Sequence, residues 1–185
     1  MRISIVFFAV ALLHAGSTWA AAADALARAA GGDHVILIRH AIAPGTGDPP
    51  NFRIGDCRTQ RNLSQQGRDQ AARIGARIRA AGIASARVFS SQWCRATETA
   101  KLLGLGSVTE LPALNSFFSH GDGPTQTREL RRWIAQQDLA TPIVLVTHQV
   151  NITAISGVHH ASGEMVVMRR GRDGALTNVG TVRTD

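Results

Sequence analysis

Two uninterrupted apolar runs are the clearest features of the hydrophobic pattern. Neither run alternates with polar residues, which is typical of strands buried on both faces of a sheet. The first predicts a strand over residues 34–39 and the second a strand over residues 141–148. Each run ends at a polar pair that contains a histidine, His40 in the first case and His148 in the second.

The rest of the pattern predicts shorter strands that alternate with helices. The helix after Ser64 has Ile74 and Ile78 on one face and stops at Gly82. Expected elements are helices over 65–81, 93–103 and 127–137, strands over 87–90 and 107–111, and a closing hairpin of 163–170 with 175–182.

This order of elements predicts an α/β fold. We expect a three-layer sandwich, with a mainly parallel central sheet and helices on both faces. In such sheets the site lies beyond the carboxyl ends of the strands, so His40 and His148 should meet in one crevice. A long loop over 41–62, rich in proline and glycine, follows the first strand, and long loops inside compact domains are usually functional.

The first twenty residues have the layout of a secretory signal peptide. Arg2 precedes a short apolar run, and small residues follow it. We predict a signal peptide over 1–20, with cleavage possible as late as residue 23, and a single domain over 34–185. An uncleaved anchor is the alternative, which the polar and small residues 16–18 disfavour. The protein is then expected to be periplasmic or secreted, with no stable membrane insertion after signal removal.

The charge pattern favours a small anionic partner. The formal net charge is +7, but the arginines are scattered and no basic run is interleaved with aromatic residues. We therefore predict a phosphorylated small-molecule substrate and no nucleic acid.

The cysteine and histidine spacings do not indicate a metal site. There is no C-x-x-C motif, and no histidine pair has helical i, i+4 spacing, so neither a metal nor a cofactor is expected. In an oxidising compartment Cys57 and Cys94 favour a disulfide, although two free thiols remain an alternative. A bond between them would fasten the long loop to the turn before Arg95.

Cations and imidazoles gather at the predicted strand ends. Arg39 and Arg95, at least one of the two histidines, and a helix N-terminus would converge on a site suited to a tetrahedral dianion. A neutral histidine nitrogen in such a site can attack phosphorus, while the arginines neutralise the phosphoryl oxygens.

Four segments, in this order, resemble the motifs of the histidine phosphatase (phosphoglycerate mutase-like) superfamily. They are "LIRHAIA", "NLSQQGRDQA", "SSQWCRATETA" and "VLVTHQVNITAISG". The resemblance implies that His40 is the phosphohistidine nucleophile with Arg39 beside it. It also implies that Arg95 binds the phosphate and that His148 contacts the transferred phosphoryl group.

The sequence departs from the superfamily at the general acid. Ser116 stands where the small-molecule branch has a glutamate, and Gln149 follows His148 where the acid phosphatase branch has an aspartate. We assign Asp122, in the loop "SHGDG", as the candidate proton donor, and Gln149 as a candidate substrate-binding residue. Arg53 is a further candidate for substrate binding. It lies in the long loop with Arg58 and Arg61, and these arginines are either substrate-binding cations or ordinary surface charge.

The predicted function is that of an exported, metal-independent phosphomonoesterase with a phosphohistidine intermediate on His40. The segment "DCRTQRNLS" is similar to the exported lipopolysaccharide core heptose phosphate phosphatase group, which implies a sugar or lipopolysaccharide-linked phosphate as substrate. The rival hypothesis is a non-catalytic phosphate- or phosphosugar-binding protein that kept the pocket and lost the general acid.

Overall fold

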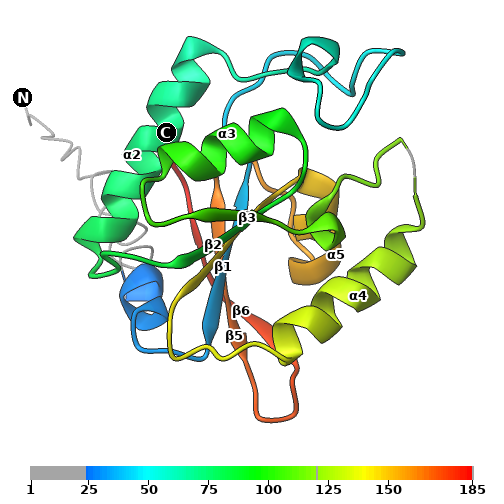
Figure 1. Ribbon diagram of the computed structural model, residues 1–185. Helices are drawn as coiled ribbons and strands as arrows, with labels where there is room; N and C mark the ends of the chain where they lie inside the picture. The colour runs from blue at the N-terminus through cyan, green and yellow to red at the C-terminus, as the bar shows by residue number, and fades with distance from the viewer. Residues whose placement is uncertain (1–23, 120, 185) are drawn as a thin grey trace, which may run out of the picture.

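A computed structural model describes residues 24–119 and 121–184 (Figure 1). The predicted signal peptide and its cleavage site lie outside the described residues. No helix in the described part of the chain is long and apolar enough to cross a bilayer.

A six-stranded sheet forms the centre of the fold, in the order β3-β2-β4-β1-β5-β6. The strands are β1 (His34–Arg39), β2 (Arg87–Ser90), β3 (Val108–Glu110), β4 (Ile143–Thr147), β5 (Met165–Arg170) and β6 (Leu176–Val182). The first four strands run parallel, whereas β5 and β6 form the antiparallel hairpin that was predicted. The predicted mainly parallel α/β sheet is confirmed.

Helices cover both faces of the sheet (Figure 1). The helices are α2 (Gln65–Ala80), α3 (Cys94–Leu102), α4 (Gly123–Ala135) and α5 (Gln149–Ser156), with the short 3-10 turns η1 (Cys57–Thr59) and η2 (Pro112–Leu114). Along β1, Ile36 and Ile38 pack with α2, α3 and a helical stretch at 24–29. Val35 and Leu37 pack with α4 and α5 on the opposite face. Because β1 is covered on both sides, its apolar run does not alternate.

The long loop packs closely against the start of α2. The Ser64 side chain accepts a hydrogen bond from the Gly67 backbone N–H at 3.1 Å, which confirms Ser64 as the N-cap. A Cβ added to Gly67 would lie 2.1 Å from the Ile42 carbonyl oxygen, so only glycine permits this approach. The long loop therefore packs against α2 already at Ile42, near the beginning of the loop.

The helices on the α4–α5 face differ from the prediction. Helix α4 begins at Gly123 rather than near residue 127, because Asp122 caps it and Pro124 occupies its first turn. Helix α5 was not predicted; it is only eight residues long and starts directly after His148. Its short sequence gives little amphipathic periodicity, which is the signal that identifies longer helices.

Candidate active site

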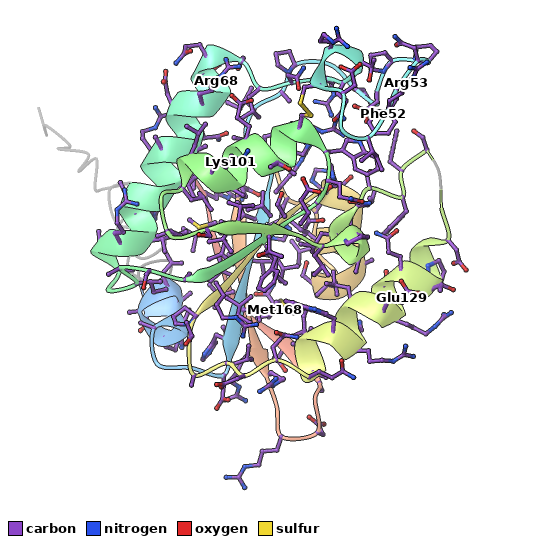
Figure 2. The ribbon with its side chains drawn as sticks, in the orientation of Figure 1. Phe52, Arg53, Arg68, Lys101, Glu129 and Met168 are labelled. Carbon is purple, nitrogen blue, oxygen red and sulfur yellow. A yellow bond between two sulfur atoms is a disulfide. The ribbon has the colours of Figure 1, made fainter. Side chains whose placement is uncertain are left out.

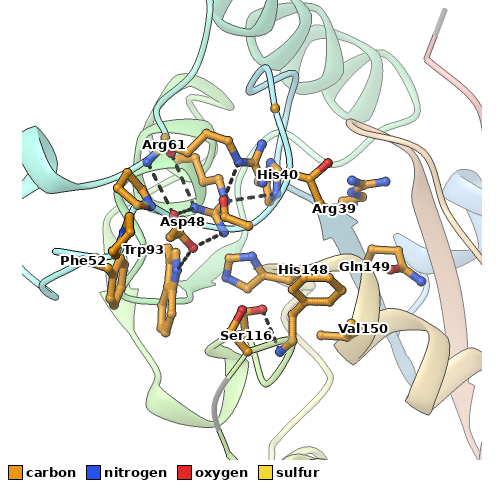
Figure 3. A pocket seen from close by; sticks show the side chains of 18 residues that line it. Arg39, His40, Asp48, Phe52, Arg61, Trp93, Ser116, His148, Gln149 and Val150 are labelled. Carbon is orange, nitrogen blue, oxygen red and sulfur yellow. Dashed lines mark hydrogen bonds and ion pairs between the residues drawn. The ribbon is translucent and has the colours of Figure 1, made fainter.

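Three neighbouring strands deliver polar side chains to one edge of the sheet. Arg39 in β1 pairs with Thr147 in β4, so the two strands end side by side. The His40 backbone N–H donates to the Thr147 carbonyl at 2.9 Å, and the Ser91 N–H donates to the Val146 carbonyl at 3.0 Å. His40, His148 and Ser91 therefore meet at the carboxyl ends of β1, β4 and β2, as expected for a parallel sheet. Figure 3 shows His40 and His148.

The His40 imidazole is held in one tautomer. Its Nδ1 lies 2.9 Å from the Ala41 carbonyl oxygen, which can only accept, so the ring proton resides on Nδ1. Nε2 accepts a hydrogen bond from Arg95 Nε at 3.2 Å. Burial, followed by the positive charge of Arg95, lowers the pKa of His40 to about 3. The ring is thus neutral near pH 7, and Nε2 carries a lone pair that can act as a nucleophile.

His148 lies beside His40 and is equally buried. The two ring centroids are 5.4 Å apart, and His148 Nε2 lies 2.8 Å from the Ser91 hydroxyl. Burial, then the neighbouring His40 and Arg95, lower the pKa of His148 well below its ordinary value. His148 is therefore a second neutral imidazole, oriented by a hydroxyl group.

Arg39, Arg61 and Arg95 line the pocket together with the two imidazoles. Figure 3 labels Arg39 and Arg61 beside His40. Burial and the charge of Arg95 lower the pKa of both Arg39 and Arg61, which reflects the crowding of like charges. Arg39 Nη1 donates to the His160 carbonyl at 2.8 Å, but its buried Nε–H has no hydrogen-bond partner. A half-buried guanidinium whose buried Nε–H is unsatisfied, and which lies among like charges, is suited to bind an anion.

Asp48 is the counter-charge of this cluster. Its carboxylate accepts from Arg95 Nη1 at 2.6 Å and Nη2 at 3.1 Å, and from Trp93 Nε1 at 2.9 Å. Burial raises the pKa of Asp48, but the hydrogen bonds from Arg95 and Trp93 outweigh burial and leave the pKa below its ordinary value. The carboxylate is therefore ionised and contacts the same arginine that contacts His40.

These side chains line a pocket of about 380 Å³. Its floor is polar and cationic, whereas Phe52, Trp93 and Phe118 contribute aromatic walls. The Phe52 and Trp93 rings stack with centroids 4.8 Å apart, and Phe118 is 61 % exposed. A pocket of this size exceeds what a phosphate group fills, which leaves space for the organic part of a ligand.

A disulfide joins the long loop to the start of α3, as the sequence favoured over two free thiols. Cys57 in η1 bonds to Cys94, the first residue of α3, with the Cα atoms 5.7 Å apart (Figure 2). The Cys94 backbone N–H also donates to Gln60 Oε1 at 2.9 Å. Because the loop contributes Asp48 and Arg61 while α3 contributes Arg95, the bond connects the two halves of the cationic site.

The structure brings together most of the residues predicted for the site, but not all of them. His40, Arg39, Arg95, His148 and Gln149 line the pocket, and so does Ser116 at the position of the missing glutamate. Arg53 does not line it; its side chain is exposed on the outer part of the loop (Figure 2), which corresponds to the surface-charge alternative. Of the three loop arginines considered, Arg61 is the one that faces the pocket.

The geometry argues against Asp122 as the proton donor. Its carboxylate caps α4, accepting from the Thr125 backbone N–H at 3.1 Å and from the Thr125 hydroxyl at 2.6 Å. Asp122 is exposed and does not line the pocket. The hydrogen bonds from Thr125 lower its pKa, which favours the ionised form over a proton-donating acid.

Asp48 is the site residue that sequence reasoning missed. It lies in "GTGDPP", where no periodic pattern indicates which way a side chain points. One signal could have identified Asp48 as a site residue. It is an ionisable residue between a glycine and two prolines, and its loop follows the strand that ends beside His40.

The described residues 24–119 and 121–184 hold no group of three or more histidine, cysteine, aspartate or glutamate side chains that could ligate a metal ion. Charge at the pocket floor is supplied by the guanidinium groups described above.

Comparisons with known proteins agree with this arrangement. The family model of the histidine phosphatase superfamily (branch 1) matches residues 35–118, while no curated protein matches the sequence significantly. Among solved structures, the protein histidine phosphatase SixA complexed with tungstate is similar, with a TM-score of 0.60, 16% identity, and coverage of 82% of this chain and 97% of that chain.

Two other solved structures show the same fold. A phosphoserine phosphatase mutant from Entamoeba histolytica in complex with phosphoserine has a TM-score of 0.62 and 15% identity, covering 82% of this chain and 98% of that chain. Phosphoglycerate mutase from Thermus thermophilus has a TM-score of 0.59 and 20% identity, covering 82% of this chain and 99% of that chain. The family match over residues 35–118 and the shared fold both support the resemblance to the histidine phosphatase superfamily that the order of the motifs implies.

Proposed function

We propose that the protein is a phosphomonoesterase that forms a phosphohistidine intermediate on His40. The observation that carries the proposal is the state of His40 Nε2. It is an unprotonated nitrogen on a neutral ring, fixed by the Nδ1 bond to Ala41 and surrounded by three arginines. Nucleophilic phosphoryl transfer needs a lone pair that is available at neutral pH and fixed positive charge for the phosphoryl oxygens.

The reaction takes place in two displacement steps. His40 Nε2 attacks phosphorus, and the bond from phosphorus to the leaving oxygen breaks with its electron pair on that oxygen. Water then attacks the phosphohistidine, and the P–N bond breaks to return the lone pair to Nε2. Arg39 and Arg95 neutralise the phosphoryl oxygens in both transition states, the chief requirement of phosphoryl transfer, so we propose that the reaction needs no metal ion.

The proposed substrate has two parts, a phosphoryl group and the organic group that carries it. SixA was solved with tungstate, and the Entamoeba enzyme with phosphoserine; both ligands fit the proposal that this cationic floor binds a phosphoryl group. We retain a sugar or lipopolysaccharide-linked phosphate as the predicted substrate. The pocket volume of about 380 Å³ and its polar lining residues, Thr46, Ser119 and Gln149 among them, are compatible with such a group.

We expect the protein to hydrolyse 4-nitrophenyl phosphate and at least one sugar phosphate, and a chelator such as EDTA to leave both rates unchanged. The measurement is steady-state hydrolysis of a panel of aryl and sugar phosphates, with and without chelator. Loss of activity on chelation would refute metal independence. No turnover, combined with saturable binding of inorganic phosphate, would refute the phosphatase proposal in favour of the phosphate-binding alternative, which the serine at position 116 supports.

We also propose that the protein is exported to the periplasm or secreted. The sequence pattern of residues 1–20 supports export, and so does the Cys57–Cys94 bond, because disulfides persist in oxidising compartments. When the chain is expressed with its own N-terminus in a Gram-negative bacterium, the intact mass of the product should correspond to cleavage between residues 20 and 23. A full-length, fully reduced chain in the cytoplasmic fraction would contradict export.

A further inference from the structure

Asp48 is the acidic side chain of the pocket. Among the described residues that line it, no other carries a carboxyl group: Ser116 and Gln149 line it at the expected acid positions, and Asp122 lies outside. Gly47 and Pro49 flank Asp48, and its side chain is 17 % exposed, so the group is held in place yet can exchange protons with water.

Arg95 joins Asp48 to the nucleophile. Its Nε–H points at His40 Nε2, while its two Nη groups bond the Asp48 carboxylate and the Arg61 carbonyl. These hydrogen bonds engage four of the five N–H groups of the guanidinium. A phosphoryl group that reaches His40 can therefore gain a bidentate interaction with Arg95 only by displacing present partners, of which the Asp48 carboxylate has the most similar chemistry.

We propose that Asp48 donates the proton to the leaving group, an inference that rests on the proposed phosphatase function. His40 accepts from Nε of Arg95 and Asp48 accepts from both of its Nη groups, so a phosphoryl group that displaces the Asp48 carboxylate from Arg95 lies between His40 and Asp48. In-line displacement places the leaving oxygen opposite Nε2. The geometry thus points to Asp48 as the group that the leaving oxygen meets.

Substrate binding changes the charges around Asp48 in the direction that a proton donor requires. In the structure, Arg95 and Trp93 hold the carboxylate ionised. When a phosphoryl dianion takes the Arg95 donors, Asp48 loses its cationic partner and gains an anionic neighbour, and both changes raise its pKa. Burial acts in the same direction, and it is the first cause that raises the pKa of Asp48.

The protons and electrons balance across the cycle. As the bond from phosphorus to the leaving oxygen breaks, that oxygen takes the electron pair and the Asp48 proton, and it leaves as an alcohol. The resulting carboxylate then accepts a proton from the water that attacks the phosphohistidine, and phosphate departs. Asp48 is again protonated, so acid and base roles alternate on one residue.

The test is the leaving-group dependence of an Asp48→Asn variant. Asparagine keeps the shape and an acceptor oxygen for Trp93 but cannot donate an acidic proton. We expect kcat/KM for ethyl phosphate to fall by about 10²-fold or more. The loss for 4-nitrophenyl phosphate should be at least about tenfold smaller, since nitrophenolate leaves without a proton. A loss of equal size for 4-nitrophenyl, phenyl and ethyl phosphate would overturn the proposal.

Two further measurements separate this proposal from structural damage and from failure of the proposed function. Inorganic phosphate should inhibit Asp48→Asn at least as strongly as the wild type, because the competing carboxylate charge is gone; weaker inhibition would indicate a merely structural role and count against the proposal. Asp56→Asn is the matched control, since Asp56 pairs with the exposed Arg58 in the same loop and does not line the pocket. If the wild type hydrolyses none of the three esters, the proposed phosphatase function is refuted, and the Asp48 proposal that rests on it is refuted as well.

Discussion

Replacing His40 by asparagine is expected to lower the turnover of 4-nitrophenyl phosphate by at least about 10⁴-fold, the order of loss seen when a nucleophile is removed. An amide nitrogen has no available lone pair, so no covalent intermediate can form on it. Arg39, Arg95 and His148, which we propose bind the phosphoryl group, remain in the pocket, so the variant should still bind inorganic phosphate. Steady-state kinetics and phosphate binding by calorimetry measure the two effects separately.

A trapping experiment makes this prediction specific to His40. Rapid acid-free quenching during turnover should yield a chain heavier by one phosphoryl group, located on His40 by peptide mapping, and the asparagine variant should lack it. His159→Asn is the matched control, because His159 is exposed and does not line the pocket. Substantial turnover by His40→Asn, or a phosphoryl group found on His148, would refute the assigned nucleophile.

The sequence pattern predicted the elements that position His40. Strand β1 was predicted with its observed bounds, because a doubly buried parallel strand is an unbroken apolar run and ends where the polar residues begin. The same argument located the end of β4 to within one residue, since the predicted strand ended at 148 and β4 ends at Thr147, and it placed His40 beside His148. Helix α5 escaped prediction because it is short and lacks a distinct polar face.

The acid at the site could not be identified in the same way. Asp122 and Asp48 both lie in loops rich in glycine and proline, and loop side chains follow no period. Helix α4 begins four residues earlier than predicted, which makes Asp122 its N-cap. The Asp122 carboxylate therefore accepts from the Thr125 backbone N–H and does not reach the pocket. Asp48 is directed at Arg95 by a loop path that depends on Arg61, whose Nε donates to the Gly47 carbonyl at 2.8 Å. Such a long-range contact has no signature in a single sequence.

Removing the disulfide with a Cys57→Ser, Cys94→Ser double variant is expected to lower the free energy of unfolding by about 2–4 kcal/mol. The bond joins positions 37 residues apart. In the chain-entropy account, releasing a closed loop of this length stabilises the unfolded chain by about 4 kcal/mol, an amount that is usually realised only in part. Chemical denaturation of the wild type and the variant, monitored by tryptophan fluorescence, measures the difference. Reductant supplies the control, since it should destabilise the wild type and leave the double variant unchanged.

The same variant should lose activity before it unfolds. Without the disulfide, hydrogen bonds such as Cys94 N–H to Gln60 and Trp93 to Asp48 still hold the loop to α3, so the fold should persist in dilute denaturant. The loop, however, contributes Arg61 and Asp48 to the pocket, and a segment held by few contacts opens at lower free energy than the core. We therefore expect kcat/KM to decline at denaturant concentrations that leave the global fold intact in the variant but not in the wild type. Coincident loss of activity and structure in both proteins would show that the loop opens only with the sheet itself, and that the disulfide stabilises the whole domain rather than the site.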